Sequence, residues 1–330
     1  MKKSLLALAV LSAFAGIASA QTNVTIYGVV DVGIASENNG INTTTRLDSG
    51  NQSGSRLGFK GSEDLGGGLS AVFALENGFD VSNGTLAQGG RMFGRQAYVG
   101  LNGGFGSVKF GRQYTPIFGA LDTIDPFGTG LTGGGSGIVS LFSAYGVRMD
   151  NAVNYSMSAA GFSGQAAYGF GEVAGNNQAA RQFGLSLGYA NGPINAVLAY
   201  HNANGAAPAV LNAKTTMLGG TYDFGVVKVH GAYAWNKGDV GLDTRDAMLG
   251  LSVPVGAAGS FLVDYVRKTD KNFNNANAAQ SAVGYLHSLS KRTNLYTSYS
   301  RNTNDSAVSY NAGGRGLTDT LFNVGIRHKF

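Results

Sequence analysis

The sequence predicts an all-β protein, specifically a 16-stranded antiparallel transmembrane β-barrel. Short segments in which apolar and polar residues alternate recur along the chain, and this period of two is typical of strands with two different faces. Glycine and aromatic residues are abundant, with 52 Gly, 15 Tyr and 18 Phe among 330 residues, which suits many strands joined by tight turns. The connections alternate between tight turns and longer polar loops, as expected for a barrel that crosses an outer membrane.

The first twenty residues have the features of an export signal. Lys2 and Lys3 form a basic start, an apolar stretch follows from Leu5 to Ile17, and Ala18-Ser19-Ala20 has the small residues of a cleavage site. We therefore expect residues 1–20 to be a signal peptide and residues 21–330 to form a single barrel domain.

Composition excludes several other classes of protein. Charged residues make up only 13% of the chain and hydrophobic residues 43%, which disfavours disorder. The absence of Cys removes disulfides and thiolate zinc sites. No stretch after the signal has 18 consecutive apolar residues, so a helical membrane protein is excluded. Removing Lys2 and Lys3 from the 24 basic residues leaves an excess of three over the 19 acidic residues, which gives no case for nucleic-acid binding.

Alternation places sixteen strands along the chain. In the first, Val24 and Ile26 lie on one face while Thr25 and Tyr27 lie on the other. Residues 38–51 are expected to form a loop. The expected strands are 24–34, 55–60, 68–80, 90–102, 106–114, 147–158, 162–172, 179–190, 193–203, 213–224, 226–237, 244–254, 258–269, 277–288, 292–302 and 318–330.

A soluble β-sandwich would also alternate, but two features favour the membrane barrel. Most of the expected strands have roughly ten residues, the length that a tilted strand needs to cross a bilayer, whereas sandwich strands average about five or six. The buried face of a sandwich would also hardly carry Arg56, Lys60, Arg95 and Arg148. We therefore expect these cations to face a water-filled lumen.

The long insertion between Arg112 and Arg148 interrupts the pattern, because alternation fails there for about thirty residues. A loop of that length without secondary structure is either functional or a misread element. Its glycine-rich part, Gly133 to Gly137, lacks the Gly-Lys-Ser/Thr of a phosphate-binding loop. We therefore interpret that part as flexible loop.

Several segments together resemble a general diffusion porin of Gram-negative bacteria, of the beta-proteobacterial type. The last strand alternates and ends on Phe330, which is similar to the assembly signal of outer-membrane barrels. The other segments that carry the resemblance are Val24-Thr-Ile-Tyr-Gly-Val-Val-Asp31, Ser55–Leu69, Arg95–Leu101, Phe110–Pro116 and Leu289–Thr293. The resemblance covers the whole mature chain.

The resemblance implies that the third surface loop, residues 115–146, folds into the lumen as a constriction loop. The segment Pro116-Ile117-Phe118-Gly119 is similar to the family's Pro-Glu-Phe-Gly, with Ile117 in place of the usual acid. Asp122 and Asp125 remain as candidate acidic residues of the loop. The missing Glu weakens the case for cation preference.

The resemblance also implies a basic wall opposite that loop. Arg56, Lys60, Arg95 and Arg148 match it by motif position, and Arg91 shares a face with Arg95. Arg112 shares a face with Val108 and Phe110, so alternation does not settle whether it lines the pore or contacts the second loop of a neighbouring subunit. An excess of one charge sign selects counter-ions, so we expect weak to moderate anion selectivity. The alternative is that some of these cations pair with lumen acids such as Asp31 or Asp150 and only hold the shape of the wall.

The partners implied by the resemblance are two further copies of the chain in a homotrimer, outer-membrane lipid and lipopolysaccharide, and the barrel assembly machinery, which would read the C-terminal strand. If Arg95 points into the lumen, alternation places Gln96 on the outer face. A polar side chain there is acceptable against a neighbouring subunit, which favours the first five strands as the trimer contact.

We expect a passive water-filled channel for small hydrophilic solutes and ions in the bacterial outer membrane. The alternative is a barrel that acts mainly as an adhesin or structural anchor through its surface loops. An enzyme is not expected, and neither is a cofactor or metal site. The four histidines (His201, His230, His287 and His328) are scattered without a metal-binding spacing, and His201, near a loop end, is the one faint candidate for a phospholipase base.

Overall fold

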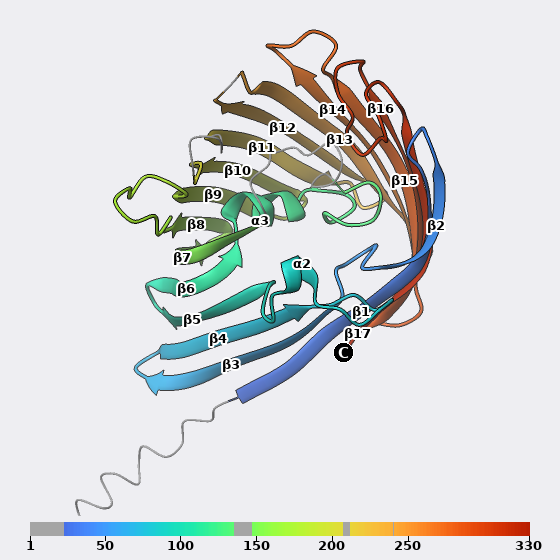
Figure 1. Ribbon diagram of the computed structural model, residues 1–330. Coiled ribbons are helices and arrows are strands. Elements are labelled where there is room, and N and C mark those ends of the chain that lie inside the picture. Colours follow the sequence, from blue (N-terminus) through green and yellow to red (C-terminus); the bar gives the residue numbers. More distant parts are fainter. Residues whose placement is uncertain (1–22, 135–146, 207–211, 240) are drawn as a thin grey trace, which may run out of the picture.

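The computed structural model describes residues 23–134, 147–206, 212–239 and 241–330. All of its strands belong to one antiparallel sheet, which closes because β1 pairs with β17 (Figure 1). The strands are β1 (Asn23–Asn38), β2 (Thr43–Ser49), β3 (Arg56–Gly66), β4 (Leu69–Gly78), β5 (Gln96–Gly103), β6 (Gly106–Tyr114), β7 (Arg148–Ala159), β8 (Phe162–Gly169), β9 (Gln182–Asn191), β10 (Ile194–Ala203), β11 (Ala213–Asp223), β12 (Lys228–Gly238), β13 (Asp243–Val255), β14 (Gly259–Asp270), β15 (Ala278–Ser288), β16 (Thr293–Asn304) and β17 (Asp319–Lys329).

These seventeen segments form a 16-stranded barrel, because β2 and β3 occupy one position in it. Residues 32–38 of β1 pair with β2, and residues 23–29 of β1 pair with β3 along the same edge. Residues 50–55 connect β2 and β3 as a short loop that leaves the barrel wall, and we call this loop the hook. The expected count of sixteen strands is therefore confirmed.

The two faces of the barrel wall differ in the way that the alternation predicts. In β11, Met217 is fully buried on the inner face, whereas its neighbour Leu218 is exposed on the outer face. In β12, Ala234 is buried and Trp235 is exposed in the same manner. The exposed apolar side chains form an outer surface that suits contact with lipid. The closed sheet also suits a membrane, because its strands leave no edge of unpaired backbone groups.

Several of the expected boundaries are wrong, and two of them change the description of the inner surface. Residues 38–51 are not all loop, since Thr43–Ser49 forms β2, a threonine-rich segment in which β-branched side chains favour the extended backbone. The strand expected at 90–102 begins only at Gln96. Before it, α2 (Ala87–Gly90) is a single turn in which Gln88 and Gly89 have positive φ, which glycine adopts without strain.

The insertion after β6 contains a short helix, α3 (Pro116–Asp122). Thr115 caps its start, because the Thr115 hydroxyl accepts a hydrogen bond from the Phe118 amide, and proline is favoured at the first helical position. Ile117, Leu121 and Ile124 follow at helical spacing and are fully buried. They pack on inner-face residues of β10–β13, among them Val197, Ala199, Met217, Ala232 and Met248.

The segment that starts with α3 follows the inside of the wall (Figure 1). The Asn195 amide group of β10 donates to the Thr123 carbonyl at 3.0 Å, and farther on the Gln280 amide group of β15 donates to the Gly133 carbonyl at 2.9 Å. Phe127 packs between these points, against Leu262 and Ala282. Residues 116–134 therefore line about half of the inner circumference, and we call them the inner segment.

The hook, residues 50–55, completes this inner layer. The Asp31 carboxylate of β1 accepts hydrogen bonds from the Gln52 and Ser53 amides at 3.0 and 2.7 Å and from the Tyr296 hydroxyl at 2.6 Å. The Leu131 amide of the inner segment donates to the Asn51 carbonyl at 2.6 Å. The hook and the inner segment are thus joined along the inside of the wall.

Among the described residues, no helix is both long enough and apolar enough to cross a membrane. The expected signal peptide, residues 1–20, lies outside the described residues, and so does the 135–146 part of the expected constriction loop.

Candidate pore constriction

Tyr114, at the end of β6, connects two of the expected wall cations to the inner segment. Its hydroxyl accepts hydrogen bonds from Arg95 at 2.7 Å and from Arg148 at 3.3 Å. The Arg148 guanidinium also lies over the Tyr114 ring, 4.8 Å from its centroid. The ring of Phe118 in α3 stacks on the Tyr114 ring, with their centroids 5.2 Å apart. Arg95 and Arg148 are therefore held close to the start of the inner segment.

The charge of Arg95 is balanced within the wall. Its Nε lies 2.7 Å from a carboxylate oxygen of Glu76 on β4, and both side chains are buried. The Tyr27 hydroxyl donates to the other Glu76 oxygen at 2.9 Å. Arg95 therefore shapes the wall and contributes little net charge to the lumen.

Arg56 and Lys60 lie on the same inner face of β3 and form no ion pair with any described residue. The Arg56 Nε donates to the Gly54 carbonyl at 2.9 Å, and the Lys60 ammonium lies 5.1 Å from the centre of the Tyr27 ring. Arg148 likewise has no carboxylate partner among the described residues. None of these three cations is therefore neutralised by a direct ion pair with a described residue.

Arg91 and Arg112 form a separate group around Asp150. Arg91 pairs with Asp150 at 2.8 Å, and Arg112 pairs with the other oxygen of the same carboxylate. The Arg112 Nε also donates to the Gly94 carbonyl at 2.8 Å. The register between β6 and β7 shifts between Gly111 and Gln113, so the alternation of Val108 and Phe110 does not continue to Arg112, which pairs with Asp150.

The structure corrects the meaning of Ile117. Its side chain is fully buried between α3 and the wall, so Ile117 holds α3 against the wall and does not face the lumen. Asp122 is exposed and accepts a hydrogen bond from the Thr129 hydroxyl at 2.9 Å. Asp125 is buried and accepts from the Phe127 and Thr129 amides at 2.8 and 3.0 Å. Of the two expected loop acids, only Asp122 meets solvent.

The expectation for Gln96 is wrong. Gln96 is the cross-strand partner of Glu76 and shares its inner face, while Val99 and Leu101 of the same strand are exposed on the outer face. Arg95 precedes the strand, so alternation does not extend back to it. The argument from Gln96 for a trimer contact on the first five strands therefore fails.

Three further cations near this wall were not among the expected site residues. Lys109 of β6 lies 4.9 Å from the centre of the Tyr98 ring, and Arg327 of β17 donates to the Ser53 hydroxyl in the hook at 2.8 Å. Lys329 is two residues beyond Arg327 on the same face. Arg327 and Lys329 alternate with the apolar residues Val324, Ile326 and Phe330 of the last strand, and this signal could have identified them.

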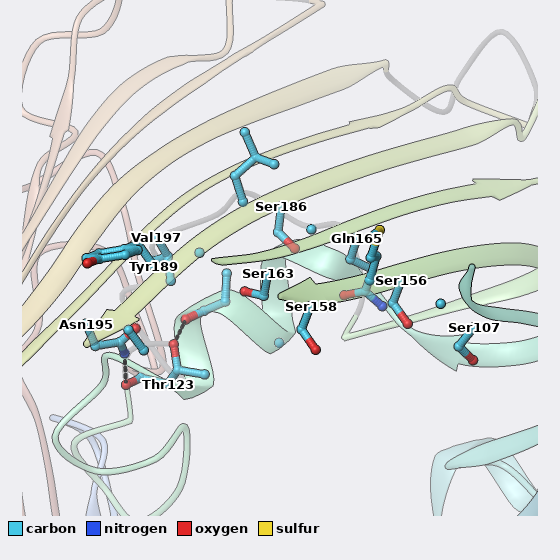
Figure 2. Close-up of a pocket in the computed structure, with 18 of the residues that line it drawn as sticks. Ser107, Thr123, Ser156, Ser158, Ser163, Gln165, Ser186, Tyr189, Asn195 and Val197 are labelled. Atoms are coloured by element: carbon cyan, nitrogen blue, oxygen red, sulfur yellow. Dashed lines mark hydrogen bonds between the residues drawn. The ribbon is translucent and has the colours of Figure 1, made fainter. Parts of the chain in front are cut away.

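Below α3 the lumen opens into a cavity of about 1050 Å³. Most of its polar lining residues carry hydroxyl or amide groups, and Figure 2 shows Ser156, Ser158, Ser163 and Gln165 around it, with Thr123 of the inner segment at one side. Lys109 also borders it. A lining of this kind hydrogen-bonds water and small solutes without binding them tightly.

Within the described part of the chain, no group of three or more His, Asp or Glu residues is arranged to hold a metal ion. The site consists of a lumen, an inner segment that lies inside it, and a wall whose cations Arg56, Lys60 and Arg148 have no ion pair with a described residue. The fold and this lumen define a transmembrane β-barrel channel.

Comparisons with known proteins give the family. A family model described as Gram-negative porin matches residues 7–307. An outer membrane porin protein of Bordetella pertussis and outer membrane porin protein 32 of Delftia acidovorans are each 35% identical to the chain, with 100% of both chains covered in each case. The solved structure of the anion-selective porin from Comamonas acidovorans has a TM-score of 0.81 and 32% identity and covers 94% of this chain and 100% of its own.

The chain belongs to the Gram-negative porin family. It is an outer-membrane porin, and it forms a passive channel through that membrane. The alternative of an adhesin or structural anchor finds no support in these relatives.

Proposed function

We propose that this porin prefers anions and that the preference arises where the inner segment faces the basic wall. The observation that carries the proposal is the imbalance of unpaired charge: Arg56, Lys60 and Arg148 have no ion pair among the described residues, whereas the described loop offers one exposed carboxylate, Asp122. The anion-selective porin of Comamonas acidovorans, at 32% identity, supports the same preference.

The physical basis is the field of fixed charges in a narrow aqueous passage. A monovalent ion about 5 Å from one fixed charge in water has an interaction energy of about 0.8 kcal/mol. Several unpaired charges of one sign therefore change the local concentration of counter-ions severalfold, and salt reduces the effect beyond about 10 Å at 0.1 M. The expected preference is weak to moderate, because the passage stays wet.

The channel is tested with purified protein in planar bilayers and in liposomes. Insertion should give stepwise conductance increases in groups of three, since we propose a homotrimer as the assembled state. Liposomes should swell faster in a small anionic solute than in a cationic solute of the same size. A silent bilayer would contradict the channel, and faster entry of the cation would contradict the anion preference.

The proposal extends to partners and to the absence of catalysis. We propose that the barrel contacts outer-membrane lipid and lipopolysaccharide, that the barrel assembly machinery recognises its C-terminal strand, and that the protein transports small hydrophilic solutes and ions without enzymatic activity. The family and the names of the Bordetella and Delftia relatives, which both describe porins, support this assignment.

The inner segment provides a direct test of the constriction. Replacing Ile117 and Leu121 with alanine removes buried contacts worth about 2–5 kcal/mol each, so α3 should detach from the wall. We expect a larger and noisier single-channel conductance. The matched control is Leu218→Ala, on the outer face of a strand that α3 covers, which should leave conductance unchanged. A double variant that folds and conducts like the parent would contradict the proposed constriction.

The C-terminal residue provides a test of assembly. The Phe330 amide and carbonyl exchange hydrogen bonds with Gly28 at 3.1 and 3.0 Å, and a Cβ on Gly28 would lie 2.3 Å from the Phe330 ring. The ring thus covers the bare backbone where β1 meets β17. We expect Phe330→Ala to lower the amount of heat-modifiable barrel in outer membranes severalfold, with Phe330→Tyr near the parent level. Equal amounts of all three would contradict the role of this side chain.

A further inference from the structure

Asp31 of β1 attaches the hook to the barrel wall. Its side chain is fully buried, and one carboxylate oxygen accepts hydrogen bonds from both the Gln52 and the Ser53 amide. The other oxygen accepts from the Tyr296 hydroxyl of β16. Hydrogen bonds to an ionised acceptor are stronger than those between neutral groups, and burial strengthens them further. The Asp31 side chain therefore fixes the hook to two strands of the wall.

The hook in turn holds cations of the basic wall. The Arg56 Nε donates to the Gly54 carbonyl at 2.9 Å, and the Arg327 Nη1 donates to the Ser53 hydroxyl at 2.8 Å. Gly54 also lies against Arg95, because a Cβ on Gly54 would be 2.7 Å from the Arg95 Nη1. The position of the hook therefore determines where these guanidinium groups lie.

The opposite side of the hook contacts the inner segment. The Leu131 amide donates to the Asn51 carbonyl at 2.6 Å. A Cβ on Gly130 would lie 2.0 Å from the Gln52 carbonyl oxygen, so the two backbones touch with no side chain between them. The hook is thus a spacer that has wall cations on one side and the inner segment on the other.

We propose that Asp31 is a positioning residue of the pore, which holds the hook so that the hook fixes both Arg56 and Arg327 and the distance from the wall to the inner segment. Asp31 acts through the hook, since its buried side chain does not meet the permeating ion. The inference rests on the proposed anion preference for its effect on selectivity, whereas its effect on conductance does not depend on that preference.

Two variants of Asp31 remove the same charge and differ in the hydrogen bonds that remain. In Asp31→Asn, the amide oxygen accepts from the hook amides and the amide nitrogen donates to the Tyr296 hydroxyl, so the hook stays in place. In Asp31→Ala, the same donors lose their acceptor, so the hook loosens. Charge alone would make both variants slightly more anion-selective, because each loses one negative charge from the wall.

Single-channel conductance and reversal potential in planar bilayers separate positioning from charge. Asp31→Asn should keep the parent conductance and an anion-to-cation permeability ratio between the parent value and about twice that value. Asp31→Ala should conduct at least about 1.5-fold more than the parent, because the inner segment loses its support. Its permeability ratio should fall at least about twofold, because the permeating ion then passes farther from the wall charges. Equal shifts in the two variants would overturn the proposal.

A second pair of variants tests the hook without any change of charge. Tyr296→Phe removes the hydroxyl that donates to Asp31 and should shift conductance in the same direction as Asp31→Ala, by a smaller amount. The matched control is Tyr299→Phe, which removes a hydroxyl from an exposed side chain of the same strand and should conduct like the parent. Equal conductance of the two tyrosine variants would also overturn the proposal.

Heat-modifiable migration in a gel verifies that each variant is folded. If Asp31→Ala does not fold, the comparison of the two tyrosine variants decides. A parent channel without anion preference would contradict the proposed function and leave this inference to the conductance measurements.

Discussion

Replacing Arg56 and Lys60 with glutamate is expected to convert an anion-preferring pore into a cation-preferring one. The double variant changes the lumen charge by four units at a wall where neither residue has an ion pair among those described. At about 0.8 kcal/mol for each charge 5 Å from the permeating ion, partly screened by salt, the ratio of anion to cation permeability should fall at least about tenfold. The measurement is that ratio, taken from bi-ionic potentials.

The control makes the same change of charge on the other side of the wall. Arg267 and Arg301 are exposed on the outer face of β14 and β16. Arg267→Glu with Arg301→Glu should therefore leave the permeability ratio within about twofold of the parent, because these charges lie outside the wall and salt screens their effect on the permeating ion. If the two double variants behave alike, the position of the charges in the lumen is not what sets the preference.

The second large effect concerns stability. Lys268 of β14 pairs with Asp246 of β13 at 2.6 Å, and the two side chains are 4% and 0% exposed. Asn236 also donates to Asp246, at 2.8 Å. Replacing Lys268 with methionine leaves a buried carboxylate without its cation, which typically costs about 3–5 kcal/mol. We expect a loss of this size in the free energy of unfolding, measured by guanidinium titration with Trp235 fluorescence.

Two comparison variants separate this effect from the loss of a side chain alone. Lys228 pairs with Asp223 at 3.3 Å, and both side chains are more than 40% exposed, so Lys228→Met should cost less than about 1 kcal/mol. Adding Asp246→Asn to Lys268→Met removes the buried charge that has lost its partner, and this should restore part of the free energy of unfolding. Equal losses for Lys268→Met and Lys228→Met would show that the buried pair contributes no more than the exposed one.

The barrel was predictable because its wall obeys one local rule. Successive side chains of each strand face the lumen and the lipid in turn, so the sequence alone indicates which face each residue occupies. Met217, which is buried, and its neighbour Leu218, which is exposed, are an example. The same rule did not reveal β2, because its threonine-rich sequence has no alternating apolar residues. A search for alternation also missed the helix α3, although Ile117, Leu121 and Ile124 have the spacing of an amphipathic helix.

The partners of the wall cations could not be predicted in the same way. Glu76 meets Arg95 because the β4–β5 register places Glu76 opposite Gln96 and the chain turns inward just before that strand. Asp150 accepts both Arg91 and Arg112 across an irregular register. These pairings depend on cross-strand register, which alternation does not specify, and they decide which cations keep an unbalanced charge.

The reversal potential of the unmodified protein in a potassium chloride gradient tests the central claim most directly. The unpaired charges of Arg56, Lys60 and Arg148 predict that chloride crosses more readily than potassium, so the dilute side should become negative relative to the concentrated side. The potential should shrink as the salt concentration rises on both sides, since screening shortens the reach of the wall charges. A dilute side that becomes positive would mean that potassium crosses more readily and would contradict the account.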